Sequence, residues 1–170
     1  SIVLAAGANA CLSTAHIDAA ADSIRQSAML VCQLETPMAT VTHAIRTAKQ
    51  ANVAVVLNPA PAQALDSTLL AMVDYLILNE TEAGQLSGIP VTDRDSAQRA
   101  SEALLAMGIR VVLLTMGGLL LGLRGRSSLA LGAPAGALLV LLAWLMESPC
   151  STCVRIAKIS QPVRTRSRHT

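Results

Sequence analysis

The stretch YLILNETEAGQLSG (75–88) decides the fold of this chain. It opens with a short apolar run, passes through Asn79 into a segment with helical spacing at 80–86, and ends at Gly88. Glycine readily adopts the left-handed conformation that ends helices. A strand that is apolar at every position is covered on both faces, which is typical of a parallel sheet. The stretch therefore predicts a strand followed directly by a helix, the repeating unit of an α/β protein.

The same alternation extends on both sides of this stretch. Further strands are predicted at 29–35 (MLVCQLE), 53–58 (VAVVLN) and 110–115 (RVVLLT). The predicted helices are one from Ser13 with Ile17, Ala20, Ile24 and Ala28 on its apolar face, one from Thr36 and Pro37 to Asn52, a short one at 65–72, and one from Asp93 to Met107 with Gly108 as its stop. Helices between parallel strands supply right-handed crossovers. The predicted fold class is a doubly wound, mostly parallel α/β sheet with helices on both faces.

The sequence changes character near residue 118. Of the 11 acidic residues only Glu147 lies beyond Glu102, whereas seven of the 13 lysines and arginines lie between Arg124 and Arg168. RVVLLT (110–115) is the last clear strand, and the residues after Gly118 show neither helical period nor strand spacing. We therefore divide the 170 residues into an α/β part, 1–118, and a divergent apolar and then basic tail, 119–170.

Polar residues follow four predicted strands: Glu35, Asn58, Asn79 and Thr115. Ligands of open α/β sheets bind at the carboxyl ends of the strands, which meet at one edge. These four residues are therefore candidates for a binding site. Polar residues also commonly begin loops, so the structural interpretation stays open beside the functional one.

Two of these strand ends carry further signals. Asn79 and Glu82 are three residues apart at a strand-to-helix junction, and such a pair suits hydrated Mg²⁺ and phosphate oxygens. The alternative is an ordinary helix start with carboxylates placed favourably to the helix dipole. Thr115 is followed closely by Gly117 and Gly118, whose backbone N–H groups could approach an anion, although glycine turns after strands are common.

Several segments together resemble the ribokinase family of sugar kinases. They are AAGANA (5–10), VCQLETP (31–37), VVLNPAPA (55–62), VDYLILNETEA (73–83), LLAMGIR (104–110) and VVLLTMGG (111–118). The resemblance implies transfer of the ATP γ-phosphoryl group to a primary hydroxyl of a pentose, with ribose as the expected sugar. It further implies Mg²⁺, a monovalent-cation site outside the matching region, and homodimers among full-length relatives.

The resemblance also implies roles for individual residues. Glu35 matches a carboxylate that holds the sugar, and Asn79 matches a residue that contacts the nucleotide phosphates. Glu82 matches a residue associated with Mg²⁺ and phosphate. Thr115 and Gly117 match the start of the nucleotide-binding loop. Phosphoryl transfer depends mainly on positioning and charge neutralisation, so these roles are physically reasonable. Asn58 is interpreted as structural.

Two parts of the family pattern are missing. Nothing corresponds to the family's N-terminal sugar-binding segment and lid strands. The family's C-terminal Gly-Ala-Gly-Asp motif, whose Asp accepts the proton of the sugar hydroxyl, has only GAPAG (132–136) as its counterpart. No acidic residue lies between Glu102 and Glu147, and Pro134 removes a backbone donor. We therefore assign no catalytic residue and expect the chain to be inactive alone. A reading-frame shift near residue 118 would explain both the lost motif and the changed composition.

The tail leaves other interpretations open. The uncharged segment 127–146 is long enough to cross a bilayer, although Gly132, Pro134 and Gly136 interrupt it. The alternative to an enzyme fragment is thus a non-catalytic nucleotide-binding or membrane-tethered remnant of the fold. Cys150 and Cys153 have the spacing of a redox or zinc half-site, but no second ligand pair accompanies them. A chain without its first strands could also fail to fold stably.

Composition gives a last set of expectations. The four cysteines suggest no disulfide framework, which favours a reducing, cytoplasmic compartment. The net charge of +2 says little about partners, and short basic endings are usually solvated. We therefore expect no nucleic-acid partner and, on balance, no membrane partner. The chain does not begin with Met and opens within an apolar pattern, so we expect that its natural start is absent.

Overall fold

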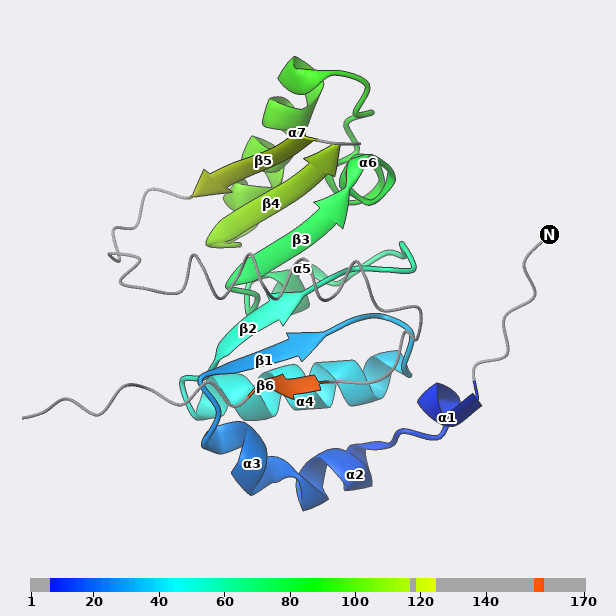
Figure 1. The fold of residues 1–170 in the computed structure, drawn as a ribbon, viewed down its shortest axis with the longest axis vertical. Coiled ribbons are helices and arrows are strands. Elements are labelled where there is room, and N and C mark those ends of the chain that lie inside the picture. Colours follow the sequence, from blue (N-terminus) through cyan, green and yellow to red (C-terminus); the bar gives the residue numbers. More distant parts are fainter. Residues whose placement is uncertain (1–6, 117–118, 125–154, 158–170) are drawn as a thin grey trace, which may run out of the picture.

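A six-stranded sheet with helices packed against it forms the body of the protein (Figure 1). The computed structural model describes residues 7–116, 119–124 and 155–157. The strands are β1 (Met29–Cys32), β2 (Ala54–Leu57), β3 (Tyr75–Asn79), β4 (Val111–Met116), β5 (Leu119–Arg124) and β6 (Arg155–Ala157). The helices are α1 (Gly7–Ala10), α2 (Thr14–Ala19), α3 (Ala21–Arg25), α4 (Met38–Gln50), α5 (Ser67–Leu70), α6 (Glu80–Ser87) and α7 (Arg94–Ala106).

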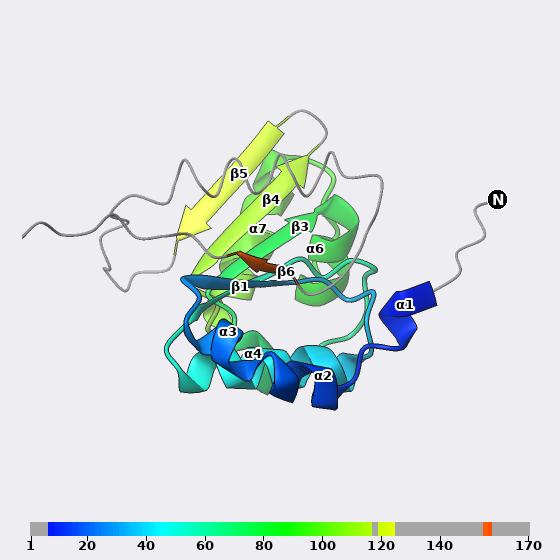
Figure 2. The ribbon, with the colours of Figure 1, turned by 60° about the horizontal axis from the view of Figure 1, so that its bottom comes forward.

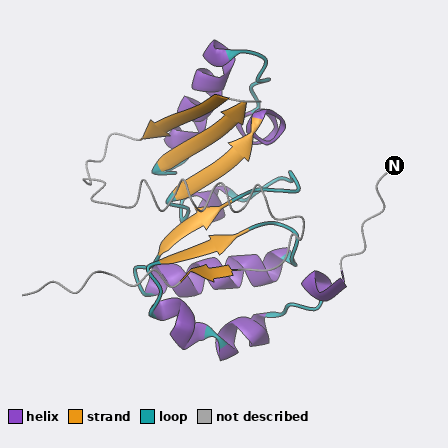
Figure 3. Cartoon of the chain, viewed as in Figure 1, coloured by secondary structure: helices purple, strands orange, loops and turns teal. Residues whose placement is uncertain are grey.

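The sheet has the strand order β5-β4-β3-β2-β1-β6. Its four central strands, β1 to β4, are parallel, and helices lie between them along the chain (Figure 3). The predicted mostly parallel α/β fold is therefore confirmed, and all four predicted strands are present. The predicted helices on both faces are not seen within the described ranges, where the helices cover one face. Strands β1 to β4 are neighbours in chain order, so right-handed crossovers place all their connecting helices on the same side.

The expectation that residues 110–115 form the last strand is wrong. β5 runs antiparallel to β4 along its whole length, from the pair Met116 and Leu119 to the pair Val111 and Arg124. β6 adds a short antiparallel strand to the other edge, against β1. An edge strand can pair through the unpaired backbone N–H and C=O groups of its neighbour, so its own sequence needs little periodicity. The proposed boundary at residue 118 stays a prediction.

Side chains of the central strands alternate between two apolar clusters. In β1, Leu30 and Cys32 belong to the larger cluster and Met29 and Val31 to the smaller one. The larger cluster also contains buried side chains from helices α2 to α7, such as Ile45. Within the described ranges the smaller cluster is formed by strand residues alone, and Figure 2 shows the helices gathered on one side of the sheet. Alternation of this kind places the main core between the sheet and the helix layer.

Several predicted helix ends are confirmed. Asp93 begins α7 and accepts a hydrogen bond from the backbone N–H of Ser96 at 2.8 Å. Gly88 follows α6 with a φ of 72°, and Gly108 follows the C-cap of α7 with a φ of 102°. Asn52 lies just beyond α4 with a φ of 58°, a conformation that asparagine adopts more easily than most residues.

Two helix predictions need correction. The helix expected from Ser13 is divided at Ala20 into α2 and α3, so its 3.6-residue spacing does not correspond to one continuous helix. Pro37, not Thr36, occupies the N-cap of α4, and no side chain caps this helix. The Thr36 Oγ1 atom is buried without a hydrogen-bond partner within the described part of the chain. Pro37 has an extended backbone, with a ψ of 132°, so α4 begins at Met38, one residue later than predicted.

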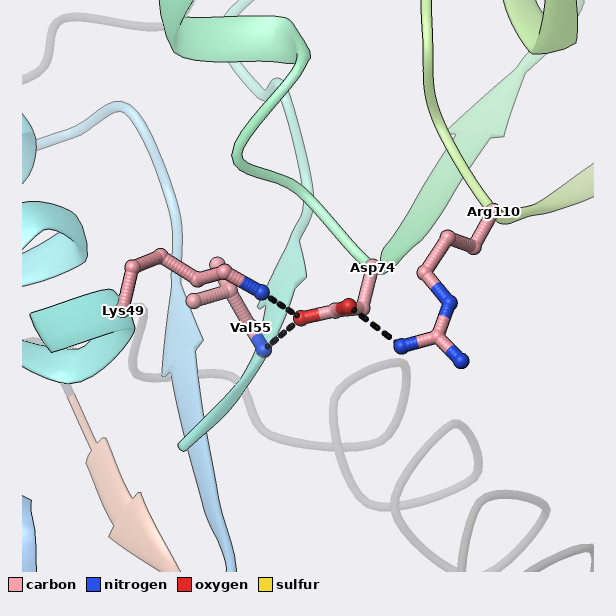
Figure 4. A network of polar contacts seen from close by, with 4 residues as sticks. All are labelled: Lys49, Val55, Asp74 and Arg110. Carbon is pink, nitrogen blue, oxygen red and sulfur yellow. Dashed lines mark hydrogen bonds and ion pairs between the residues drawn. The ribbon is translucent and has the colours of Figure 1, made fainter. Parts of the chain in front are cut away.

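Asp74 connects three parallel strands at the edge opposite their carboxyl ends (Figure 4). Its carboxylate accepts hydrogen bonds from the backbone N–H of Val55 at 2.9 Å, from Lys49 Nζ at 2.8 Å and from Arg110 Nη1 at 3.0 Å. The Asp74 side chain is only 4% exposed. A buried carboxylate needs such partners, because burying an unpaired charge is costly. This cluster therefore fixes how β2, β3 and β4 meet.

No helix in the described ranges is both long and apolar enough to span a membrane. The segment 127–146, considered above as a membrane anchor, lies outside the described residues. The same is true of Cys150 and Cys153.

Candidate functional site

The carboxyl ends of the parallel strands meet at one edge of the sheet and bring together the residues predicted for the site. Cys32 is in register with Leu57, and Asn79 with Thr115. Asn58 continues the β1–β2 pairing, because its backbone N–H donates to Cys32 O at 2.9 Å. Glu35 lies three residues beyond the end of β1. The sheet therefore places Glu35, Asn58, Asn79 and Thr115 along the same edge.

Asn79 and Thr115 are direct neighbours on β3 and β4. The Thr115 hydroxyl donates to Leu78 O at 3.4 Å, a long bond that connects it to the backbone of β3. Asn79 is exposed and Thr115 is half-buried. The two polar side chains thus form a small accessible group where the strands end.

Asn79 and Glu82 hold the start of helix α6. Asn79 Oδ1 accepts the backbone N–H of Glu82, Glu82 Oε2 accepts the backbone N–H of Asn79, and both distances are 2.9 Å. This reciprocal pair is a capping box, which satisfies two N–H groups that a helix start leaves open. Glu82 is only 7% exposed. Within the chain, the hydrogen bonds of Asn79 and Glu82 are therefore those of an ordinary helix start.

The same geometry limits how Glu82 could serve a magnesium ion. One of its carboxylate oxygens is already occupied by the capping bond. Within the residues that the structure describes, no group of three or more His, Cys, Asp or Glu side chains is arranged to hold a metal. Mg²⁺ usually keeps several waters and uses only one or two carboxylates, so the remaining Glu82 oxygen fits contact through water.

Glu35 is bound by a residue to which the sequence analysis gave no role. Asn9 Nδ2 donates to Glu35 Oε2 at 3.2 Å across 26 residues of sequence. Asn9 lies on α1 and is 9% exposed, and Glu35 is half-buried. The available signal was the segment AAGANA (5–10), one of the segments that carry the family resemblance.

The loops that follow β1 and β2 lie side by side next to Glu35. Leu34 N donates to Ala60 O at 2.9 Å and joins the two loops. Thr36 Oγ1 and Asn58 Oδ1 are buried here without a partner in the described ranges. Buried polar atoms normally find a hydrogen bond, so these two oxygens are suited to water or a polar ligand.

Gly117, predicted to contribute to the nucleotide-binding loop, lies outside the described residues. So does the GAPAG segment (132–136), the counterpart of the family motif that carries the catalytic aspartate. The described site therefore consists of Glu35, Asn79, Glu82 and Thr115, with Asn9 as an addition.

Comparison with known proteins agrees with this architecture. Residues 1–119 match the pfkB family carbohydrate kinases. A ribokinase from Haemophilus influenzae is 43% identical over 134 residues, which are 78% of this chain and 44% of that protein. A deoxyribokinase from Salmonella typhi is 39% identical over 118 residues, 69% of this chain and 39% of that protein. The chain thus spans less than half the length of these relatives.

Solved structures show the same fold. A ribokinase from Giardia lamblia superposes with a TM-score of 0.65 at 25% identity, covering 75% of this chain and 42% of that one. An Arabidopsis thaliana ribokinase, complexed with ribose and ATP, gives a TM-score of 0.61 at 21% identity, covering 86% of this chain and 52% of that one. Together with the match over residues 1–119, these likenesses show that the chain belongs to the pfkB family of carbohydrate kinases.

Proposed function

We propose that this chain is part of an ATP-dependent sugar kinase that phosphorylates a primary hydroxyl of a pentose, with ribose as the substrate. The observation that carries the proposal is the placement of Glu35 and the Asn79–Thr115 pair at one sheet edge. β1 and β3 lie on either side of β2, two strand spacings or roughly 10 Å apart. Such a separation allows a sugar to bind at Glu35 while the phosphates of a nucleotide bind at Asn79 and Thr115.

Each side chain suits the group proposed for it. The Glu35 carboxylate can accept hydrogen bonds from sugar hydroxyls. Asn79 uses its Oδ1 in the capping box, while its Nδ2 makes no hydrogen bond within the described ranges and can donate to a phosphate oxygen. The Thr115 hydroxyl, whose bond to Leu78 O is long, can turn toward the same group. In the proposed site, Gly117 would add a backbone donor.

Magnesium would supply the neutralisation of charge that phosphoryl transfer requires. We assign Glu82 to this ion through a water ligand, because its Oε2 atom is occupied and the carboxylate is buried. The proposal includes no protein base, since no acidic residue lies between Glu102 and Glu147. The chain alone is therefore proposed to bind sugar and nucleotide without measurable turnover.

A non-catalytic nucleotide-binding role is the second candidate. It is favoured by the same missing aspartate, since Asn79 and Thr115 remain in place. The two candidates differ at Glu35, which a nucleotide-binding remnant would not need. Ribose binding therefore separates them.

Calorimetric titration of the chain with ribose, and with Mg²⁺ and a non-hydrolysable ATP analogue, tests the proposal. Glu35→Ala should abolish ribose binding and leave nucleotide binding intact. Glu102→Ala, which removes an exposed carboxylate on α7, is the control and should change neither. Nucleotide binding without ribose binding would favour the second candidate. Phosphate transfer from labelled ATP to ribose would contradict the proposed inactivity.

A further inference from the structure

We propose that Asn9 is a positioning residue that holds the Glu35 carboxylate for the sugar, an inference that rests on the proposed function of Glu35. The two residues are far apart in sequence, and one hydrogen bond of 3.2 Å joins Asn9 Nδ2 to Glu35 Oε2. Asn9 comes from α1, a helix that contributes none of the strand-end residues of the site.

Both members of the pair are connected to the start of helix α4. Glu35 lies just before this helix, which begins at Met38. Asn9 O accepts the backbone N–H of Leu12 at 3.3 Å, and Leu12 O accepts the hydroxyl of Thr40 at 2.9 Å. Thr40 lies in the first turn of α4 and is 2% exposed. Since both segments are anchored to one helix, the distance between Asn9 and Glu35 is well defined.

The chemistry of the contact suits a positioning role. A glutamate side chain has three rotatable bonds, and ordering it when a ligand binds costs conformational entropy. The bond from Asn9 occupies one carboxylate oxygen and leaves the other for a ligand. An amide is neutral, so it orients the carboxylate without cancelling the charge that attracts sugar hydroxyls, as a lysine or arginine in its place would do.

Burial separates this contact from an ordinary surface hydrogen bond. Asn9 is 9% exposed although it lies on a short helix of four residues. A buried amide that gives one N–H to a carboxylate makes a stronger bond than a neutral pair, because one partner is charged. Loss of such a bond is expected to weaken sugar binding about tenfold.

Four variants test the proposal: Asn9→Ser, Asn9→Asp, Glu35→Gln and the double variant of Asn9→Asp with Glu35→Gln. Asn9→Ser removes the amide, and Asn9→Asp puts a second carboxylate against Glu35. Both Asn9 variants should weaken ribose binding about tenfold or more, and both should leave affinity for the magnesium–nucleotide analogue within about twofold.

In the double variant the new amide at position 35 can donate to the aspartate. The double variant should therefore recover resistance to urea relative to Asn9→Asp, but not ribose binding. Asn52→Asp adds the same charge at an exposed turn and is the matched control.

The outcomes separate the two proposals. If Glu35→Ala weakens ribose binding but the Asn9 variants do not, the positioning role is wrong and the proposed function stands. If the Asn9 variants weaken sugar and nucleotide binding equally, Asn9 supports the fold in general and the inference is overturned. If the parent chain binds no ribose, the proposal that this chain binds the sugar by itself is wrong. The urea resistance of the double variant, compared with that of Asn9→Asp, then shows separately whether the two side chains interact.

Discussion

The side chains of Asn79 and Glu82 each accept the other's backbone N–H at 2.9 Å. The residues proposed to serve phosphate and magnesium are therefore also the residues that begin helix α6. A change at either position affects helix stability and ligand binding together. Variants that separate the two effects are needed to interpret the site.

Glutamine at position 82 separates them. Glu82→Gln keeps an oxygen that can accept the Asn79 N–H, so we expect the free energy of unfolding to change by less than about 0.5 kcal/mol. Glu82→Ala loses this bond and should cost about 1 kcal/mol. Both variants should weaken magnesium-dependent nucleotide binding, because both remove the charge. Urea denaturation and calorimetric titration measure the two effects.

Glu80→Gln is the control for this pair, since Glu80 lies in the same first helical turn but takes no part in the capping box. It should leave nucleotide binding unchanged. Equal stability of Glu82→Ala and the parent chain would show that the capping box contributes nothing. Unchanged nucleotide binding in Glu82→Gln would remove the magnesium role from this residue.

Asp74 is expected to be the polar side chain on which stability depends most. Asp74→Asn keeps an acceptor for Val55 N–H but leaves Lys49 and Arg110 without their carboxylate. Removing one partner of a buried ion pair typically costs about 3–5 kcal/mol. The cations are 33% and 48% exposed and can still reach water, so we expect the lower part of this range, about 3 kcal/mol. Urea denaturation measures the loss.

Asp22→Asn provides the comparison. Asp22 pairs with Arg25 at 2.9 Å but is 88% exposed, and such surface pairs contribute about 0–1 kcal/mol. A similar loss in the two variants would mean that burial of Asp74 does not matter. Arg110→Gln should fall between them, because it leaves Lys49 and the Val55 N–H on the carboxylate.

The sequence was sufficient to predict the central strands because each is a continuous apolar run with a polar residue where it ends. It also predicted the ends of α4, α6 and α7, since Asn52, Gly88 and Gly108 act through their local backbone conformation. Strands β5 and β6 were missed because their pairing depends on the free edges of other strands. The break at Ala20 was missed because apolar spacing alone does not distinguish one helix from two.

Within the site, the sequence predicted which residues come to the sheet edge but not how they are bonded. The Asn79 and Glu82 contact is local, so both interpretations of that pair could be stated in advance. The bond between Asn9 and Glu35 joins residues 26 positions apart, and the Asp74 cluster joins residues up to 36 apart. Such pairings are determined by the packing of several elements, which periodicity does not encode.

The N-cap of α7 should contribute to acid sensitivity. Hydrogen bonds from the Ser96 backbone, and then from its side chain, lower the pKa of Asp93 below its usual value of 3.8 in the folded chain. A lowered pKa in the folded state means that the carboxylate stabilises the protein above the unfolded pKa. That contribution is lost as the pH falls through the folded pKa. In Asp93→Asn the amide keeps a cap without titrating, so stability between about pH 5 and pH 2 should fall less steeply than in the parent.

Urea denaturation at a series of pH values measures this difference. Asp95→Asn removes a carboxylate from the same first turn without removing the cap, and it is the control. An identical pH dependence in Asp93→Asn and the parent chain would contradict a stabilising role for the ionised cap.

The two described cysteines should differ greatly in reactivity. Cys32 lies in β1 with 1% exposure, and burial raises the pKa of its thiol to about 12. At pH 8 only about one thiol in ten thousand would then be ionised, and the thiolate is the reactive form. Cys11 is exposed. Iodoacetamide at pH 8 should therefore modify Cys11 quickly and Cys32 only after urea unfolds the chain, as measured by peptide mass spectrometry.

Peptide mapping also keeps this result independent of Cys150 and Cys153, which lie on other peptides. Cys11→Ser is the control, because it removes the exposed thiol and should leave Cys32 equally protected. Fast modification of Cys32 without urea would mean that β1 opens readily to solvent. Since Glu35 lies three residues beyond β1 and β1 pairs with β2, such opening would also disrupt the proposed sugar site. Protection of Cys32 therefore reports on whether this edge of the sheet is formed in solution.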